Sequence, residues 1–180
     1  MVITLLVYLL VAFLLLIFLI IFSVYTISLI YSSIKGSPYV ATRKKRIEEI
    51  LKEANLKRGR FFVELGSGDG RIVRTAVRKY NVHGVGIDIN PLLVLWSKIL
   101  GNKNIDFRVE NIFDTDLRQA DYLYLFLMPK LISELKKKME KELKPGSLVI
   151  SHGFPVIGWE NKLTKKLEVS PFPTYFYKLK

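Results

Sequence analysis

The pattern of hydrophobic positions divides the chain into two unequal parts. Residues 1–34 carry no charged side chain, and from Val2 to Phe22 nearly every residue is Leu, Ile, Val or Phe. A helix needs about 20 apolar residues to cross a bilayer, so this first part is long enough to span one. From residue 35 onward, short apolar runs alternate with amphipathic stretches. That alternation predicts the strands and helices of an α/β domain.

The first part lacks the marks of a cleaved signal peptide. Such a peptide has a basic start, an apolar core of roughly 7–15 residues and small residues at its cleavage site. A buried helix is also excluded, because the rest of the chain cannot build a core that surrounds it. We therefore predict a transmembrane anchor over 1–34, a short linker over 35–42 and a folded domain over 43–180. Within the linker, Gly36-Ser37-Pro38 is expected to end the spanning helix.

Past the linker, each change of pattern is marked by Gly, Pro or Asn. Thr42 can cap the first helix, which we expect to reach about Asn55. Later helices are expected to begin near Gly70, at Leu92 and near Leu131. The expected strands are 61–65, 82–87, 105–109, 122–127, 147–152, 163–169 and 174–179. This order predicts a Rossmann-like α/β fold, a seven-stranded doubly wound sheet that ends in an antiparallel hairpin.

Composition and charge bear on the cellular compartment of the domain and on its orientation relative to the membrane. The chain has no cysteine and two histidines, which excludes disulfides and thiolate metal sites, and we predict no metal centre. It carries 28 Lys and Arg against 16 Asp and Glu, all of them after residue 34. Nothing basic precedes the apolar segment, whereas Lys35 and the run Arg43–Arg46 follow it. Because basic residues stay on the cytoplasmic side, we expect a single-pass membrane protein whose domain is cytoplasmic.

The chemistry is concentrated where the first strand of the domain ends. The series Glu64-x-Gly66-x-Gly68-x-Gly70 precedes a helix, and Asp88 ends the next strand. Ligands of open α/β sheets bind at the carboxyl ends of the strands, where Asp88 can accept hydrogen bonds from both hydroxyls of a ribose. A carboxylate at Glu64 would repel the pyrophosphate of a dinucleotide, but it suits a ligand that carries an ammonium and a sulfonium.

This series resembles motif I of the class I S-adenosylmethionine (SAM) dependent methyltransferases. Together with PYVAT at 38–42 and SHGFPVIGW at 151–159, the run VELGSGDGRIV at 63–73 is similar to one family. That family is the small protein-lysine methyltransferases of archaea and their membrane-anchored mitochondrial relatives, which methylate lysines on the ATP synthase c subunit and the adenine nucleotide translocase. The resemblance extends from Pro38 to the C-terminus. It implies the class I methyltransferase fold, SAM as the cofactor and lysine methylation.

Two positions depart from related patterns. Asn111 stands where many relatives carry Asp, and it is equally well explained as a turn residue. The tetrapeptide after the fourth strand is Phe126-Leu127-Met128-Pro129, not the (D/N)PP(Y/F) of nucleic-acid amino-methyltransferases. This argues against adenine or glutamine methylation. The expected cofactor contacts are Glu64, Gly66, Ser67, Gly68, Gly70, Asp88, Ile89, Asn111 and Ile112.

The substrate side is less well defined by the sequence. Methyl transfer needs alignment and desolvation, and free lysine must first lose a proton from a group of pKa ~10.4. The catalytic candidates are Tyr39, which could accept a hydrogen bond from the amine, and His152, which could accept its proton, although a packing tyrosine and a structural histidine explain them as well. No residue stands out as a general base. Further candidates for the substrate pocket are Thr42, Met128, Pro129 and Trp159, the last of which also suits a packing role.

Three functions stay open on the sequence alone. The leading hypothesis is a membrane-anchored N-methyltransferase that acts on lysines of a membrane protein or a membrane-bound complex. The second is methylation of a lipid or quinone headgroup, which would require an apolar path from the bilayer. The third is a non-catalytic SAM-binding membrane scaffold, against which the intact Glu64, glycines and Asp88 speak. Nucleic acid is not expected as a partner, since only the basic charge favours it.

Overall fold

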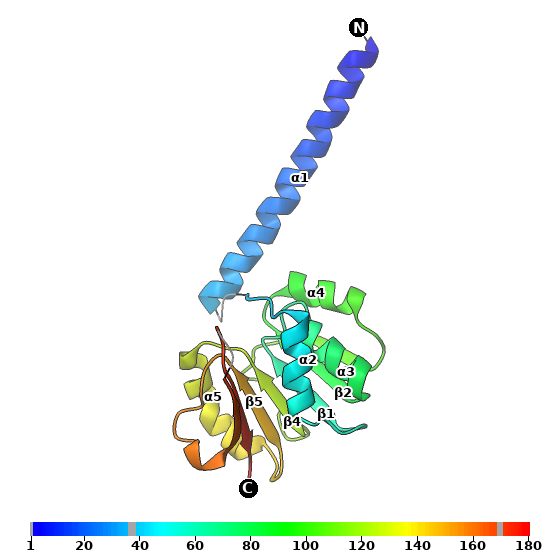
Figure 1. The fold of residues 1–180 in the computed structure, drawn as a ribbon. Helices are drawn as coiled ribbons and strands as arrows, with labels where there is room; N and C mark the ends of the chain where they lie inside the picture. Colours follow the sequence, from blue (N-terminus) through cyan, green and yellow to red (C-terminus); the bar gives the residue numbers. More distant parts are fainter. Residues whose placement is uncertain (1, 36–38, 169–170) are drawn as a thin grey trace.

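One long helix projects from a mixed α/β domain. The computed structural model describes residues 2–35, 39–168 and 171–180 (Figure 1). Helix α1 spans Val2–Lys35, and its residues 2–33 form a stretch that is long and apolar enough to cross a membrane, by length and composition. The most apolar 18 residues of this stretch are not buried against the domain. The predicted break at Gly36-Ser37-Pro38 lies outside the described residues.

The domain is built on one seven-stranded sheet in the order β3-β2-β1-β4-β5-β7-β6. Strands β1 to β5 are parallel, and β7 is antiparallel to both β5 and β6. The predicted doubly wound sheet with its terminal hairpin is confirmed. The strands are β1 (Phe61–Leu65), β2 (His83–Asp88), β3 (Ile105–Val109), β4 (Tyr122–Leu125), β5 (Leu148–His152), β6 (Leu163–Leu167) and β7 (Thr174–Lys178).

Helices cover both faces of the sheet. On one face lie α2 (Lys44–Glu53), α3 (Arg71–Tyr80) and α4 (Pro91–Leu100), and on the other lies α5 (Pro129–Glu142) (Figure 1). A short 3-10 helix, η1 (Glu160–Lys162), precedes β6.

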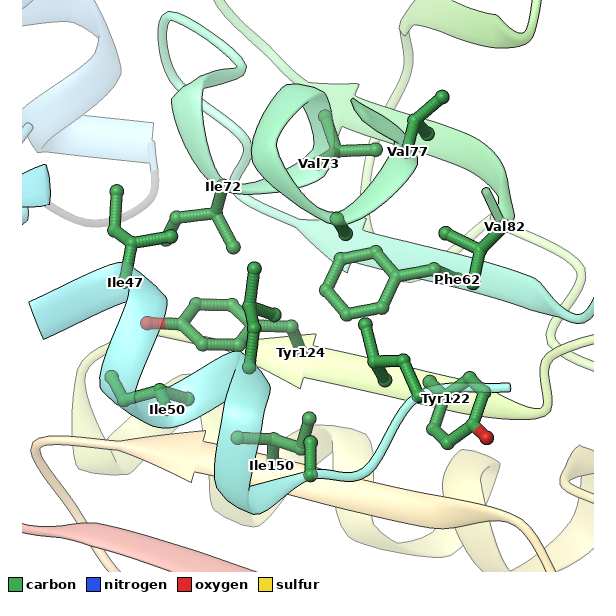
Figure 2. Close-up of a cluster of buried hydrophobic side chains, with 14 of the residues drawn as sticks. Ile47, Ile50, Phe62, Ile72, Val73, Val77, Val82, Tyr122, Tyr124 and Ile150 are labelled. Atoms are coloured by element: carbon green, nitrogen blue, oxygen red, sulfur yellow. The ribbon is translucent and has the colours of Figure 1, made fainter. Parts of the chain in front are cut away.

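Side chains of successive strand residues point to opposite faces, so the sheet divides its apolar residues between two cores. Phe62 and Tyr124 pack under α2 and α3, where Figure 2 shows Tyr124 beside Ile47 and Ile50 of α2. The alternate residues of the same strands, such as Val63, pack against α5.

Several element boundaries differ from the prediction by one or two residues, and two of them bear on the site. Helix α2 begins at Lys44, so its N-cap is Arg43 and not Thr42, and no side chain caps it. Strand β4 ends at Leu125 and does not continue to 127. The register explains the early end: Leu125 pairs with Leu65, the last residue of β1, after which the glycine loop turns away and leaves the next residue without a partner on that side.

Candidate functional site

The loop between β1 and α3 forms one wall of a cavity at the carboxyl edge of the sheet. Gly68 and Gly70 have φ of +55° and +71°, a region that side chains disfavour. Space excludes a side chain as well. A Cβ on Gly68 would lie 2.8 Å from a ring carbon of Tyr39, and one on Gly70 would lie 2.5 Å from the ring of Phe107. The glycines therefore let the rings of Tyr39 and Phe107 pack directly against the main chain of the loop.

Asp88 closes the cavity from the end of β2. Its carboxylate is buried, and the two oxygens accept hydrogen bonds from the N–H groups of Gly68 (2.7 Å) and Asn90 (2.8 Å). Burial raises the pKa of Asp88, and those two N–H donors act in the opposite direction. Each carboxylate oxygen has a second lone pair, so Asp88 can still accept hydrogen bonds from a ligand in the cavity.

Glu64 is the second carboxylate of the cavity. It is 3% exposed, and its Oε2 accepts a hydrogen bond from the N–H of Val73 (3.0 Å) in the first turn of α3. Burial raises the pKa of Glu64 well above its ordinary range. Two carboxylates that are costly to ionise in one cavity favour a cationic ligand, because its charge would offset their desolvation.

Residues 39–42, which we call the strap, line the same cavity beside the glycine loop. The guanidinium of Arg71 donates to the hydroxyl of Tyr39 (3.0 Å) and to the carbonyl of Thr42 (3.3 Å). The same group donates from Nε and Nη2 to Asp69 (2.9 and 2.7 Å). Burial, followed by the charge of Asp69, raises the pKa of Tyr39. Arg71 therefore ties the strap to the loop.

The last turns of α1 contribute to the same site. Ser32 is buried and lines the cavity. One turn earlier, Ser28 donates from its hydroxyl to Oδ1 of Asn90 (2.6 Å), and the carbonyl of Ser28 accepts from the side-chain amide of Asn90 (3.1 Å). Asn90 is fully buried and caps α4 by accepting from the N–H of Leu92 (3.0 Å). The end of the apolar helix is thus fixed to the domain beside the cavity.

A second cleft opens on the other side of the strap. It shares Val40, Ala41, Thr42 and Phe126 with the first cavity, so the two are separated by a thin common wall. One side of the cleft is aromatic: the ring of Phe126 lies 4.6 Å from that of His152 and 5.3 Å from that of Phe172, between centroids. The opposite side is charged and consists of Arg43, Lys45, Arg46 and Glu49.

The side chain of His152, which lines this cleft, is uncharged at neutral pH. Its Nδ1 lies 2.8 Å from the hydroxyl of Thr174, and both side chains are buried. Burial, with a smaller contribution from Arg46, lowers the pKa of His152 to about 4. A group with that pKa is a weak acceptor for the proton of an ammonium. His152 supplies an uncharged, apolar wall at neutral pH.

The structure brings most of the predicted site residues together. Gly70, a predicted cofactor contact, forms the N-cap of α3 and is not among the residues that line the cavity. Asn111 is at the exposed rim, where its Oδ1 accepts from the N–H of Phe113 (3.1 Å), as a turn residue does. Ser67 also lines the wall, and within the described residues its buried hydroxyl has no hydrogen-bond partner. The predicted residues that line the cavity are Tyr39, Thr42, Glu64, Gly66, Ser67, Gly68, Asp88, Ile89, Asn111 and Ile112.

Three predicted pocket residues lie elsewhere. Met128 and Pro129 begin α5, and because β4 ends early, Phe126 and Leu127 occupy the cavity wall in their place. Trp159 lines neither cavity. It is fully buried, donates to Glu140 on α5 (2.7 Å) and packs edge-on against Tyr177. This placement corrects the expectation that the three residues line the substrate pocket.

Several residues of the site were not predicted. Asp69 and Arg71 belong to the recognised run 63–73, and an ion pair inside a glycine-rich turn was the available signal. Ile72 belongs to the same run and Phe113 follows the predicted Ile112, whereas the rest come from segments distant in sequence, which no local pattern brings together. The unpredicted residues of the cavity are Ser32, Val40, Ala41, Asp69, Arg71, Ile72, Leu93, Phe113, Phe126, Leu127 and Leu131.

Comparison with known proteins identifies the family. A family model described as the ANTKMT methyltransferase domain matches residues 64–163, more than half of the chain. The chain belongs to this methyltransferase family. The matched part contains the glycine loop, Asp88 and His152, and it leaves out α1 and the strap.

Two relatives in other organisms agree with this assignment. A protein-lysine N-methyltransferase from Saccharolobus islandicus (strain REY15A) is 36% identical over 137 residues, which cover 73% of this chain and 85% of that protein. The adenine nucleotide translocase lysine N-methyltransferase of Mus musculus is 31% identical over 130 residues, which cover 68% of this chain. The chain spans 56% of that mouse relative's length. The family resemblance predicted from 38–42, 63–73 and 151–159 is confirmed.

A solved structure extends the comparison to the cofactor. The crystal structure of an RNA methyltransferase from Salinibacter ruber in complex with S-adenosyl-L-homocysteine has a TM-score of 0.73 and 29% sequence identity. It covers 78% of this chain and 94% of that chain. The class I methyltransferase fold and SAM as the cofactor are therefore confirmed. This protein is a SAM-dependent methyltransferase.

The residues of the first cavity fit SAM. The absence of a Cβ at Gly68 lets the ring of Tyr39 pack close against the glycine loop, so the loop and the strap together line the cavity. Glu64 and Asp88 complement the ammonium, sulfonium and hydroxyls of SAM, and Ile89 and Ile112 offer apolar surface to a flat ring. We call this space the cofactor cavity and the second one the aromatic cleft.

Proposed function

We propose that this protein is a membrane-anchored protein-lysine N-methyltransferase that acts on a membrane protein or a membrane-bound complex. The observation that carries the proposal is the common wall of the two cavities. A flexible side chain that enters the aromatic cleft would reach the cofactor cavity past Phe126 and the strap. Lysine has the length and the flexibility for such an approach, and relatives at 36% and 31% identity are named lysine N-methyltransferases.

The cofactor cavity would hold SAM through residues that the sequence singles out. We assign the ribose hydroxyls to Asp88, the cationic methionine part to the side of Glu64, and the adenine to Ile89, Ile112 and the rim at Asn111. SAM, when bound, supplies an activated methyl group. The protein adds a fixed approach, because Arg71 holds the strap and the glycine loop in one arrangement.

The aromatic cleft would prepare the lysine amine. Loss of water and the positive charges of Arg43, Lys45 and Arg46 both disfavour an ammonium there, so entry lowers the lysine pKa from its ordinary value of about 10.4 and favours the neutral, nucleophilic amine. His152, with a pKa of about 4, is a weak base, so the proton would leave to water at the mouth of the cleft. Alignment and desolvation then account for the rate without a strong general base.

The location at a membrane is supported by α1. Its length, its lack of charge over 2–33 and its lack of burial all suit a spanning helix. The basic run Arg43–Arg46 follows it, which favours a domain on the cytoplasmic side. A direct test is extraction of native membranes with alkaline carbonate, followed by protease treatment of sealed vesicles. The proposal predicts that the chain stays in the pellet and that protease added from the cytoplasmic side removes the domain.

The activity can be tested with labelled methyl-SAM. Total membranes are incubated with the full chain or with Asp88→Ala, and the protein, lipid and RNA fractions are then separated. We expect label in protein with the wild type, mapped to lysine by mass spectrometry, and a loss of label with the variant. Label in lipid alone would replace this proposal with headgroup methylation.

RNA is a second candidate substrate, favoured by one specific observation. The charged side of the aromatic cleft carries Arg43, Lys45 and Arg46 against a single acid, Glu49. Such a rim attracts phosphates, and the Salinibacter ruber structure at 29% identity is titled an RNA methyltransferase. The sequence after β4 lacks the (D/N)PP(Y/F) tetrapeptide, which ranks this candidate second. Label confined to the RNA fraction would reverse the order.

A further inference from the structure

Helix α4 presents an apolar face that the domain does not use. Its inner residues Leu93, Val94 and Ser97 are buried against the sheet. Its outer residues form what we call the α4 face, and each is between 46% and 66% exposed. The α4 face consists of Leu95, Trp96, Ile99 and Leu100. Large contiguous apolar patches are uncommon on proteins that are surrounded only by water, so we expect another surface to cover this face.

The end of α1 fixes where the α4 face lies. Asn90, which caps α4, exchanges two hydrogen bonds with Ser28 of α1. An α-helix rises about 1.5 Å per residue, so the 26 steps from Val2 to Ser28 cover about 39 Å. The hydrocarbon core is about 30 Å thick, or about 40–45 Å with the headgroups. If the apolar run begins at the far edge of the core, Ser28 lies about 9 Å or less beyond the near edge, at headgroup depth.

The orientation of α4 agrees with this depth. Figure 1 shows α4 at the end of the domain from which α1 projects, with the sheet on its other side. Since its inner residues face the sheet, its outer residues face the side toward which α1 leaves. The composition also suits the membrane interface, where tryptophan is enriched. Lys98, the one charged residue of α4, is exposed among these apolar residues.

We infer that the α4 face is a second membrane contact, which inserts into the interfacial layer of the bilayer and holds the domain in one orientation. The inference rests on the proposed anchor role of α1. Its consequence is that the strap and both cavities are held at a fixed height over the membrane surface. A lysine close to the bilayer can then reach the aromatic cleft, whereas a lysine far out on a soluble protein cannot.

The absence of cysteine from the sequence allows a direct test in the full chain. A nitroxide is attached to Ile99→Cys, and the protein is reconstituted in vesicles of phosphatidylcholine and phosphatidylglycerol. Collisions of the label with oxygen, which concentrates in lipid, are compared with collisions with a water-soluble nickel complex. Two reference variants carry the same label: Phe18→Cys in the apolar part of α1, and Lys137→Cys on the exposed side of α5.

We expect the label at 99 to collide with oxygen and to be shielded from nickel, as the label at 18 is, while the label at 137 is open to nickel. Nickel access at 99 equal to that at 137 would overturn the inference. Shielding from both reagents would overturn it too, because a protein surface and not lipid would then cover the face. A label at 18 that is itself open to nickel would instead refute the anchor, and with it the proposed location.

A paired variant adds a functional readout. Trp96→Glu with Ile99→Glu places two charges on the α4 face, away from the residues that line either cavity. We expect unchanged SAM affinity and a loss of methyl transfer to proteins in native membranes. Glu134→Lys, an exposed charge reversal on α5, is the matched control. Transfer equal to that of the wild type would show that the face has no part in reaching the substrate.

Discussion

The cofactor cavity and the aromatic cleft share a wall but are built in different ways. The cavity is made of main chain and buried carboxylates, and its principal parts follow one another within 25 residues, from Glu64 to Asp88. The cleft is made of aromatic rings and a basic rim, and its parts are spread from Val40 to Phe172. The comparison teaches that a cofactor site can be fixed by a local motif, whereas the substrate site depends on how distant segments are joined.

The largest effect is expected in the cavity. Asp88→Ala removes the proposed ribose acceptor and leaves two buried N–H groups, of Gly68 and Asn90, without their partner. Loss of the ribose contact should make SAM bind at least about tenfold more weakly, a loss of about 1.4 kcal/mol, and each unpaired donor costs about 1–3 kcal/mol of folding stability as well. Isothermal titration with SAM checks this. Asp106→Ala, an exposed carboxylate on β3, is the control, and unchanged binding by Asp88→Ala would mean that SAM does not use this cavity.

Substitution in the cleft should separate the two sites. Phe172 lines the aromatic cleft but not the cofactor cavity. It packs edge-on against Phe126, with 5.3 Å between the ring centroids. Phe172→Ala removes a contact worth about 1 kcal/mol, so we expect methyl transfer to membrane protein to fall about fivefold while SAM affinity is unchanged. Phe61→Ala, a partly exposed ring at the opposite end of the sheet, should leave both unchanged. A fall in SAM affinity with Phe172→Ala would contradict the division into two sites.

What could be predicted from the sequence also differs between the two sites. The spacing of the glycines and the position of Asp88 at a strand end could be predicted, because the carboxyl ends of parallel strands converge on one edge. Trp159 could not be placed, since its burial depends on the pairing of α5 with the loop before η1. Nor could Phe172 be predicted as a partner of His152, because that contact requires β7 to insert antiparallel beside β5.

The strap joins the two sites, so Arg71 should affect both by a smaller amount. Arg71→Gln loses the ion pair with Asp69 and the hydrogen bonds to the hydroxyl of Tyr39 and the carbonyl of Thr42. Partly exposed ion pairs contribute about 0.2–1 kcal/mol, so we expect SAM affinity and methyl transfer each to fall about threefold. Arg78→Gln on the outer side of α3 is the matched control. An effect on only one of the two measurements would show that the strap does not couple the sites.

The smallest expected effect distinguishes the two sites by pH. Burial raises the pKa of Glu64 and Asp88 above 4.5 and 3.8, whereas His152 of the cleft is neutral down to about pH 4. Both carboxyl groups have a higher pKa in the folded than in the unfolded chain. The stability that they contribute is fully present at a pH below their unfolded-state pKa values, and it is lost as the pH rises through their folded-state pKa values.

SAM is cationic next to these carboxylates, so its binding lowers their pKa values and releases protons. The increase in unfolding temperature on adding SAM should therefore grow as pH rises above about 4.5, and it should level off once both groups are ionised. A thermal melt with and without SAM at several pH values measures this growth, and Glu64→Gln should flatten it. An equal shift at every pH would mean that the two carboxylates are already ionised in the empty cavity, and that their burial is not what selects a cationic cofactor.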